Sequence, residues 1–489
     1  MTQADRAEEV RWLESLGLKP PSLEWPPEDP YAMPFTRKSL IVPTAWYRNR
    51  PQTVRADLFR EDLKLLRRIM ETAYGGWESA KKRGWNWDKF FQDWDASLAA
   101  RGNSDISLVD AFFTWREFMK VQLDNHSGPI VGGMAANGHA GSWISVLANT
   151  PAGTCTELRN KKDEVYPIDN SDPAQRPKKR EDLDGRAVNF IVAPWSKGAI
   201  TAVHCGADWI PSQPAWLDED GAARRASIRA LAQTEKDEPS FRSISPQTGY
   251  LRLPTFSKQN GELLRVLEPS LKSRTHNEAL LIVDLRGNDG GDARLDAVAN
   301  WAKIPSAGGP RREGASCLYP SLRWGYTQIS SMTLKPPISD GLRSGLQHGL
   351  NALMASDEPG CPAKFTEIAP RWTYTQHKYP AAPVGKTRLL LLTDNFCGSD
   401  CEYAILHLAA IPGTVVAGLN SFGVAQFVQP GYFVLPNARL PFRIALGTED
   451  QYGDGRSFDG YGFDVDIVLS TQKDQSAENI LRLAERLLK

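Results

Sequence analysis

Two segments of this chain are apolar runs that break into a polar, glycine-bearing turn and then into a helical pattern. They read LLIVDLRGNDGGD at 280–292 and LLLLTDNFCGSDCEYAI at 389–405. An apolar run without alternation is typical of a strand that is buried on both faces of a sheet. Open α/β sheets collect their ligands beyond the carboxyl ends of such strands. The sequence therefore predicts an α/β fold in which the two turns meet in one site.

The residues of these turns have side chains and backbone groups suited to acyl chemistry. Ser399 lies between Gly398 and Asp400 at a predicted helix start, where unpaired N–H groups and the helix dipole favour negative charge. Gly290 and Gly291 let backbone N–H groups approach a bound carbonyl, as an oxyanion hole requires. Local chemistry leaves a second interpretation open, in which Ser399 only caps a helix and the glycines only form a turn.

The first turn, DLRGNDGG at 284–291, resembles the first motif of the C-terminal processing (tail-specific) and tricorn-core serine peptidases. Four further segments follow in the order that this family has. They are LDNHS at 123–127, GYLRL at 249–253, VVAGLNSFG at 415–423 and DGYGFDVDI at 459–467. The resemblance covers residues 55–135 and 245–489, and it implies a crotonase-like ββα spiral core and cleavage of peptide bonds.

The family has two ways to activate its serine, and the sequence favours one of them. The processing peptidases use a lysine just after a Thr-Phe-Gly-type turn, where a desolvated amine acts as the base. This chain has Val424 at the matching place and no lysine between Lys386 and Lys473. The tricorn-like branch uses a histidine from an N-terminal helical subdomain and an Asp directly after the serine, which His126 and Asp400 match. The resemblance therefore implies the Ser-His branch.

In this interpretation Ser399 attacks the scissile carbonyl, His126 takes and returns the proton, and an acidic residue supports the imidazole. The resemblance places Asp459 where the tricorn-like branch has a glutamate that acts through a serine next to the histidine. Here the neighbour of the histidine is Asn125, so the contact between the acidic residue and His126 must differ from the one in that branch. Without the resemblance, His126 reads as a structural histidine, and the acidic, glycine-rich loop of Asp459 reads as a solvated turn or a weak cation site.

Two reserve candidates for the acid are Glu449 and Asp454, which lie in the same loop region as Asp459. The implied oxyanion donors are the backbone N–H groups of Asp400 and Gly290, with Gly291 as the second choice. Asp284 and Arg286 are expected to hold the end of the strand through hydrogen bonds, without a catalytic role. The residues imply no metal and no organic cofactor.

Length and charge narrow the classes of partner. The chain has 489 residues, with 58 basic and 58 acidic side chains, so it lacks the basic excess that nucleic acids or anionic membrane surfaces demand. No apolar run is long enough to span a bilayer. We expect a peptide or protein substrate, and the sequence leaves the oligomeric state open.

The polar amino terminus lacks the apolar h-region of a signal peptide. Bacterial relatives suggest a periplasmic or secreted setting, with the cytosol of tricorn-like proteins as the alternative.

The chain has six cysteines, which permit three disulfides without requiring any. Cys397 and Cys401 bracket Ser399, and either a bridge or two packed thiols fits this spacing. Metal ligation there is not expected, because no second Cys or His pair has matching spacing.

The pattern along the chain predicts four parts. Residues 1–54 read as an irregular arm, 55–135 as a helical subdomain that carries the histidine, 136–245 as a β-rich insert, for which a PDZ-like fold is one option, and 246–489 as the α/β catalytic core. Within the core, 304–385 reads as a long variable segment. Helical periodicity is clearest at 63–73, 87–98, 108–123 and 480–488.

Three function classes compete. The leading one is a serine peptidase that works through an acyl-enzyme on Ser399. The second is a non-catalytic lipid- or retinoid-type binding protein on the same core, as in the interphotoreceptor retinoid-binding protein. The third is an esterase or peptide ligase that uses the same acyl-enzyme, because serine chemistry does not by itself choose the acyl acceptor.

Overall fold

The fold comes from a computed structural model of the whole chain. It forms two compact units, each assembled from three chain segments. Unit 1 comprises Met1–Gly138, Gly314–Arg371 and Phe427–Glu449, and unit 2 comprises His139–Glu313, Trp372–Gln426 and Asp450–Lys489. The structure describes residues 3–19, 51–111, 113–115, 124, 126–130, 143–147, 155–171, 176–193, 200–211, 213–214, 221–234, 238–256, 279–291, 313–316, 320–332, 334, 336–355, 372–373, 388–409, 413–450, 459–471 and 473–489.

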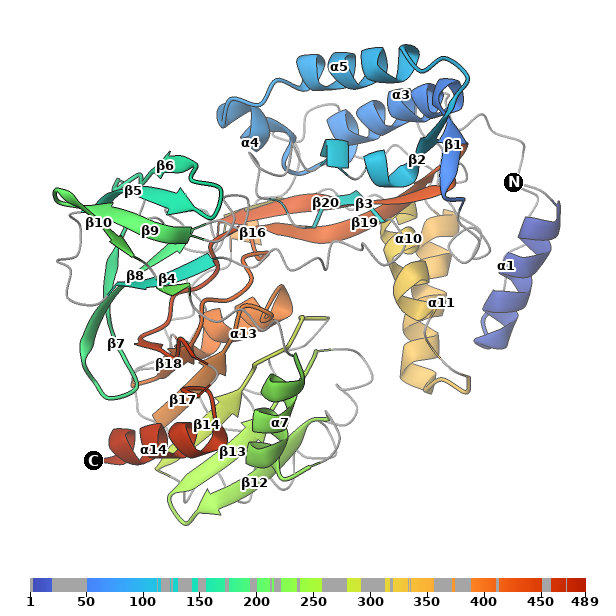
Figure 1. The fold of residues 1–489 in the computed structure, drawn as a ribbon. Coiled ribbons are helices and arrows are strands. Elements are labelled where there is room, and N and C mark those ends of the chain that lie inside the picture. Colours follow the sequence, from blue (N-terminus) through green and yellow to red (C-terminus); the bar gives the residue numbers. More distant parts are fainter. Residues whose placement is uncertain are drawn as a thin grey trace. The chain divides into compact units, whose positions relative to one another are not determined.

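A ten-stranded sheet forms the centre of unit 2 (Figure 1). Its order is β11 (Gln213–Pro214), β4 (Trp143–Leu147), β8 (Ala187–Ala193), β7 (Lys178–Glu181), β21 (Ile467–Val468), β18 (Val415–Gly418), β17 (Arg388–Thr393), β14 (Leu280–Asp284), β13 (Thr248–Arg252) and β12 (Ser240–Ser245). The strands from β7 to β13 pair in parallel, and the outer pairs are antiparallel. The mixed α/β class predicted from the sequence is therefore confirmed.

The two apolar runs are neighbouring parallel strands, β14 and β17. Ile282 of β14 stands opposite Leu390 of β17, and every residue of β14 is buried. Because parallel strands end at the same edge of a sheet, the turns that follow β14 and β17 emerge side by side. This confirms the expectation that the two chemically loaded turns lie next to each other.

Among the described residues of unit 2, three helices accompany this sheet: α7 (Gly221–Ala232), α13 (Asp400–Ala409) and α14 (Ala477–Leu488). α7 and α14 contribute Leu231, Ile480 and Leu483 to a core cluster that also contains Ile282 and Leu390 of the central strands. Ser476 caps α14 by accepting a hydrogen bond from the Asn479 N–H at 3.3 Å. The predicted C-terminal helix therefore docks its apolar face on the sheet, as amphipathic helices do.

A second, antiparallel sheet in unit 2 has the order β10 (Asp208–Pro211), β9 (Ile200–Cys205), β5 (Cys155–Asn160) and β6 (Val165–Pro167), and a disulfide joins Cys155 to Cys205. Strands β4, β7 and β8 of the predicted insert instead extend the core sheet, because β7 pairs with β21 through Glu181 and Ile467. The boundary that we expected between residues 245 and 246 is thus not a boundary between compact units. The short strand β16 (Trp372–Thr373) also belongs to unit 2.

Unit 1 contains the predicted helical region. Its helices near the amino terminus are α3 (Ala56–Ala73), α4 (Trp77–Lys82) and α5 (Trp87–Ala99), and β1 (Thr53–Arg55) pairs with β2 (Asp105–Ser107). Leu63, Leu66 and Ile69 form the buried stripe of α3, so the predicted periodicity is confirmed there. The hairpin of β19 (Phe427–Leu435) and β20 (Leu440–Asp450) is antiparallel, and β20 also pairs with β3 (Gly128–Pro129) and β15 (Glu313–Ser316).

The prediction of an irregular arm over residues 1–54 was wrong at its start. Gln3–Ser15 forms helix α1, in which Trp12 and Leu13 are buried. They pack in one cluster with Trp324 and Leu346 of α10 (Pro320–Ser331) and α11 (Asp340–Ala355). This segment is helical because its apolar residues find a tertiary partner, which outweighs its weak intrinsic pattern. α10 and α11 also lie in the stretch that we had read as variable.

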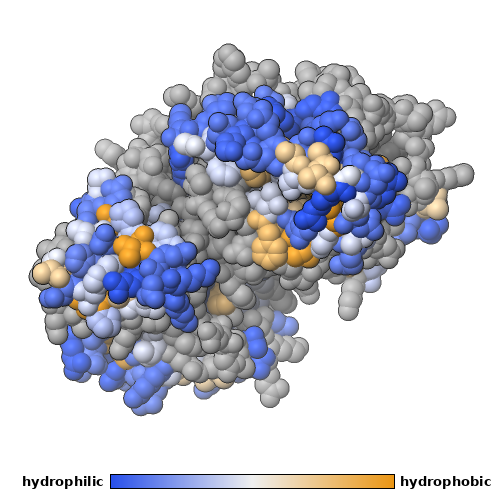
Figure 2. All heavy atoms as spheres, turned by 45° about the horizontal axis from the view of Figure 1, so that its top comes forward, coloured by the Kyte–Doolittle hydropathy of each residue, from blue (hydrophilic) through white to orange (hydrophobic). Residues whose placement is uncertain are grey.

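On the face shown in Figure 2, hydrophilic residues predominate among those described, and hydrophobic ones appear only in small groups. Leu58, Phe113 and Val165 are the large hydrophobic side chains that are exposed among the described residues. Scattered exposure of this kind is normal and needs no partner. In the described part of the chain, no helix is long and apolar enough to cross a membrane.

Candidate active site

Ser399 occupies an unusual position between strand β17 and helix α13. It directly precedes Asp400, the first residue of the helix, and its φ is +55°, in the left-handed region that non-glycine residues rarely adopt. An ordinary cap such as Ser476 has an extended backbone and a side chain bonded to the helix. The hydroxyl of Ser399, in contrast, makes no hydrogen bond to a described residue. The geometry thus departs from that of a simple side-chain cap and resembles a strained strand-to-helix elbow.

The first turn lies directly against Ser399. At Gly290, whose φ is +91°, a Cβ would stand 2.6 Å from the Gly398 carbonyl oxygen, 2.8 Å from Cβ of Ser399 and 3.0 Å from the Asp400 nitrogen. Real Cβ atoms do not approach other atoms so closely, so only glycine fits. The structure therefore brings together two residues that the sequence placed in one site, Gly290 and Ser399.

Asn288 ties the two turns together. Its backbone carbonyl accepts a hydrogen bond from the Gly398 N–H at 3.1 Å, and its side-chain oxygen accepts one from the Gly290 N–H at 2.9 Å. Its amide nitrogen donates to the Leu253 carbonyl at 2.9 Å. Because the Gly290 N–H already has an acceptor, a bound oxyanion would compete for it. The Gly291 N–H makes no hydrogen bond to another described residue.

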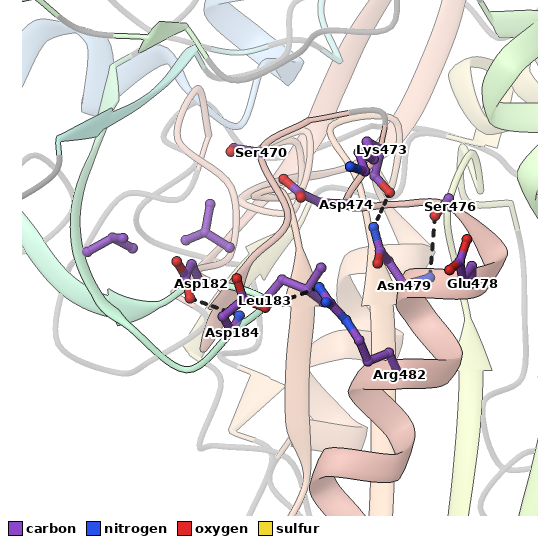
Figure 3. Close-up of a pocket in the computed structure, with 12 residues that line it drawn as sticks. Asp182, Leu183, Asp184, Ser470, Lys473, Asp474, Ser476, Glu478, Asn479 and Arg482 are labelled. Carbon is purple, nitrogen blue, oxygen red and sulfur yellow. Dashed lines mark hydrogen bonds and ion pairs between the residues drawn. The ribbon is translucent and has the colours of Figure 1, made fainter.

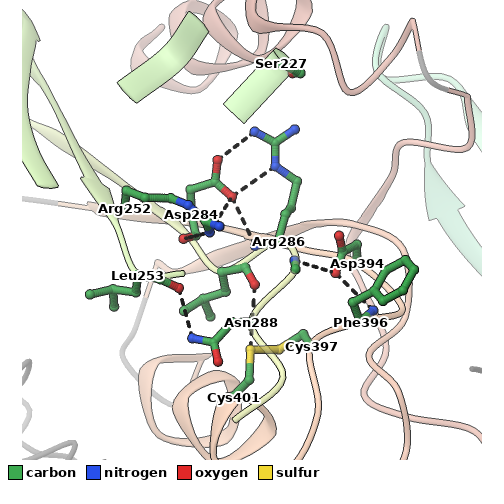
Figure 4. A network of polar contacts seen from close by, with 12 residues as sticks. Ser227, Arg252, Leu253, Asp284, Arg286, Asn288, Asp394, Phe396, Cys397 and Cys401 are labelled. Carbon is green, nitrogen blue, oxygen red and sulfur yellow. Dashed lines mark hydrogen bonds and ion pairs between the residues drawn. A yellow bond between two sulfur atoms is a disulfide. The ribbon is translucent and has the colours of Figure 1, made fainter. Parts of the chain in front are cut away.

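A buried ion pair anchors the base of the first turn. Arg286 donates to both carboxylate oxygens of Asp284, at 2.9 and 2.6 Å (Figure 4). The Tyr250 hydroxyl donates to the same carboxylate at 2.9 Å. Burial disfavours the charge on Asp284, but Arg286 and Arg252 outweigh it and hold the pKa of that carboxyl below its ordinary value. These contacts confirm that Asp284 and Arg286 form hydrogen bonds at the end of the strand.

Glu402, on the first turn of α13, is a functional candidate that the sequence reading missed. Its side chain is fully buried and accepts four hydrogen bonds. The donors are the Ser399 N–H (3.2 Å), the Ser421 hydroxyl (2.5 Å), the Gly423 N–H (2.7 Å) and the Val424 N–H (2.8 Å). Burial raises the pKa of Glu402 to about 7, although these donors favour the ionised form. The Ser-x-x-Glu spacing at 399–402, typical of a helix start, was the available signal.

Val424, which stands where the resemblance would place a lysine, donates its backbone N–H to Glu402. A short way along the chain, the Gln426 N–H donates to Oδ1 of Asp459 at 2.7 Å, and Asp459 is fully buried. The Gly460 N–H donates to the Gly423 carbonyl at 2.9 Å. The loop of Asp459 is thus joined to the segment that Glu402 holds, and Asp459 is not a residue of a solvated turn.

His126 belongs to unit 1, where the side chain of Asp124 holds its backbone through a hydrogen bond. Asp124 accepts from the His126 N–H at 2.7 Å and from the Tyr74 hydroxyl at 2.8 Å. Burial, with a contribution from Arg443, lowers the pKa of His126 to about 3, so its imidazole is neutral at pH 7. Its Nδ1 has no hydrogen-bond partner among the described residues.

The remaining sequence-predicted residues are less fully placed. Glu449 lies near the end of strand β20 in unit 1, while the neighbouring candidate Asp454 and the histidine neighbour Asn125 lie outside the described residues. Cys397 and Cys401 form a disulfide across the turn that carries Ser399, which settles the alternative between a bridge and two thiols. Both cysteines are fully buried.

A separate pocket of about 530 Å³ lies at the start of α14 (Figure 3). Charged side chains of both signs line it, among them Asp184, Lys473 and Arg482. Arg482 pairs with Asp184 at 3.1 Å, so these charges partly neutralise one another. None of the residues that surround Ser399 lines this pocket.

No family model matches the chain, and no curated protein matches it either. Similar solved structures are those of mature CPAF (13% identity, 89% of this chain and 96% of that chain, TM-score 0.44), of a candidate peptidase from Parabacteroides merdae (12%, 89% and 97%, 0.44) and of the photosystem II D1 C-terminal processing protease (13%, 87% and 96%, 0.37). A C-terminal processing protease is therefore among the solved structures that this chain resembles.

Proposed function

We propose that this chain is a serine peptidase that cleaves peptide bonds through an acyl-enzyme on Ser399. The observation that carries the proposal is the left-handed backbone of Ser399 at the start of α13, with Gly290 packed against it and no described hydrogen-bond partner for its hydroxyl. A strained elbow of this type presents a nucleophile at the end of a strand. The ordered motifs of the sequence point to the same chemistry.

The proposed reaction has two halves. Oγ of Ser399 attacks the scissile carbonyl carbon, while a ring nitrogen of His126 accepts the hydroxyl proton. The tetrahedral intermediate collapses, the C–N bond breaks, and the imidazolium gives its proton to the leaving amine. A water molecule then attacks the acyl-enzyme with His126 as base, and the carboxylic acid product and free Ser399 result. A neutral imidazole at pH 7 is the form that such a base needs.

Backbone N–H groups would stabilise the oxyanion. We assign this role to Asp400, at the positive end of α13, and to Gly290 or Gly291 of the first turn. Asp459 is our candidate for the acid that supports His126, and its burial favours an interior role over a solvated one. The core would be a crotonase-like ββα spiral. Two disulfides among the described residues support a periplasmic or secreted setting.

The test is intact-protein mass spectrometry after reaction with a fluorophosphonate probe. The wild type should gain one probe mass, and Ser399→Ala and His126→Ala should lose labelling, whereas Asp459→Asn should label slowly. Ser476→Ala is the matched serine control, because Ser476 also precedes a helix but caps it in the ordinary way. His204→Ala, on strand β9, is the histidine control. A folded wild type that stays unlabelled would refute the proposal.

A further inference from the structure

Glu402 makes more contacts than a helix start requires. In an ordinary capping box, the third residue of the helix accepts only the N–H of the cap, and the cap side chain bonds back to the helix. Here Glu402 accepts the Ser399 N–H and three further donors from outside the helix. The reciprocal bond from the Ser399 side chain is not found among the described residues. The carboxylate thus serves contacts beyond helix capping.

The three further donors all belong to the segment 421–424, which lies against the nucleophile turn. The Phe422 N–H donates to the Cys397 carbonyl at 2.8 Å. A Cβ at Gly398 would stand 3.1 Å from Cγ2 of Val424, so the two segments approach closely there. Glu402 bonds to both segments and therefore fixes the distance between them.

The same segment leads on to the proposed acid. The Ser421 hydroxyl, which donates to Glu402, also accepts the Phe463 N–H at 2.7 Å. The Gly460 N–H donates to the Gly423 carbonyl. The loop of Asp459 is therefore attached to residues whose own position depends on Glu402.

We propose that Glu402 is a positioning residue for the nucleophile, whose carboxylate holds the Ser399 turn against residues 421–424 and the loop of Asp459. It acts only through other residues and does not contact substrate. Because the Ser399 N–H is occupied by Glu402, the serine keeps the left-handed backbone that leaves its hydroxyl unbonded to described residues. The inference rests on the proposed serine chemistry and adds a residue to it.

The test separates the limiting rate of labelling by the fluorophosphonate probe from the probe concentration that gives half of that rate. Glu402→Gln keeps the shape of the side chain but turns an NH₂ group toward backbone donors. Loss of the hydrogen bonds that the carboxyl oxygens of Glu402 accept should lower the limiting rate about tenfold or more. The half-saturating concentration should stay within about twofold, because no probe contact changes.

Two further variants keep the test decisive. Ser421→Ala removes one donor and leaves the three backbone donors, so it should lower the limiting rate by a smaller factor, and it decides the question if Glu402→Gln does not fold. Glu478→Gln, an exposed glutamate in the first turn of α14, is the matched control and should label at the wild-type rate. Circular dichroism at 25 °C checks that each variant is folded.

The outcomes distinguish the two ideas. If the folded wild type is not labelled, the proposed function fails, and this inference fails with it. If the wild type is labelled and the folded Glu402→Gln and Ser421→Ala variants reach the wild-type limiting rate, the function stands and the positioning role is overturned. A change in the half-saturating concentration alone would also overturn it, since that would place Glu402 in probe binding.

Discussion

Replacing Gly290 by alanine tests the closest approach between the two turns. The new Cβ would stand 2.6 to 3.0 Å from atoms of Gly398, Ser399 and Asp400, two of which belong to the backbone. A non-glycine residue at φ +91° costs about 1 kcal/mol, and overpacking of a close-packed site adds about 1–3 kcal/mol. We therefore expect Gly290→Ala to lower the free energy of unfolding by about 2–4 kcal/mol.

Gly206→Ala is the matched control for this prediction. Gly206 also belongs to unit 2 and has a φ of +67°, but a Cβ there would meet nothing within 4 Å. It should cost only the backbone part, about 1 kcal/mol. Urea unfolding, followed by circular dichroism, gives both free energies, and their difference isolates the steric part.

The same variant should lose probe labelling, because the displaced atoms include Cβ of Ser399 and the nitrogen of Asp400. Equal stability of Gly290→Ala and Gly206→Ala, together with labelling of Gly290→Ala at the wild-type rate, would refute the reasoning. In that case the two turns would not meet at Gly290.

Three further predictions concern charge and the disulfide. The pKa of Glu402 rises from 4.5 to about 7 on folding, so the folded state retains a proton that the unfolded state loses. The free energy of unfolding should therefore fall by about 3 kcal/mol as the pH rises from 4.5 to 7. Urea unfolding across this pH range should show the decrease, and Glu402→Gln should remove most of it. Asp284→Asn leaves buried guanidinium groups without a countercharge and should cost about 3–5 kcal/mol in the same assay, whereas the exposed Asp57→Asn should change little. Cys401→Ser opens the disulfide across the nucleophile turn and should slow labelling, while Cys205→Ser, which opens the Cys155–Cys205 disulfide, should not; equal rates would argue that the Cys397–Cys401 bridge has no part in holding Ser399.

Local patterns predicted the elements that position the site. The unbroken apolar runs gave β14 and β17, and the 3.6-residue stripe gave α3 with its end before Gly75. These features depend on neighbours along the chain, so the sequence contains most of the information.

Features that depend on distant residues were not predictable in this way. In the sequence, Glu402 shows only the pattern of a helix-start residue. Three of its four hydrogen-bond donors come from residues 421–424, about twenty positions further along the chain. Helix α1 was missed because its stability comes from packing on α10 and α11. The extension of the core sheet by β7 depends on a pairing between residues 181 and 467, which no local window contains.

The three-segment composition of each unit has a consequence for how the chain must fold. The boundaries between the two units fall after residues 138, 313, 371, 426 and 449, so the chain changes unit five times. No truncation from either terminus yields a complete unit. Unit 1 cannot finish folding until Glu449, near the end of β20, has been synthesised, and unit 2 cannot finish until α14 has been synthesised. Contacts of such long sequence separation slow folding. Peptide fragments cut at these boundaries should therefore regain structure only when they are mixed.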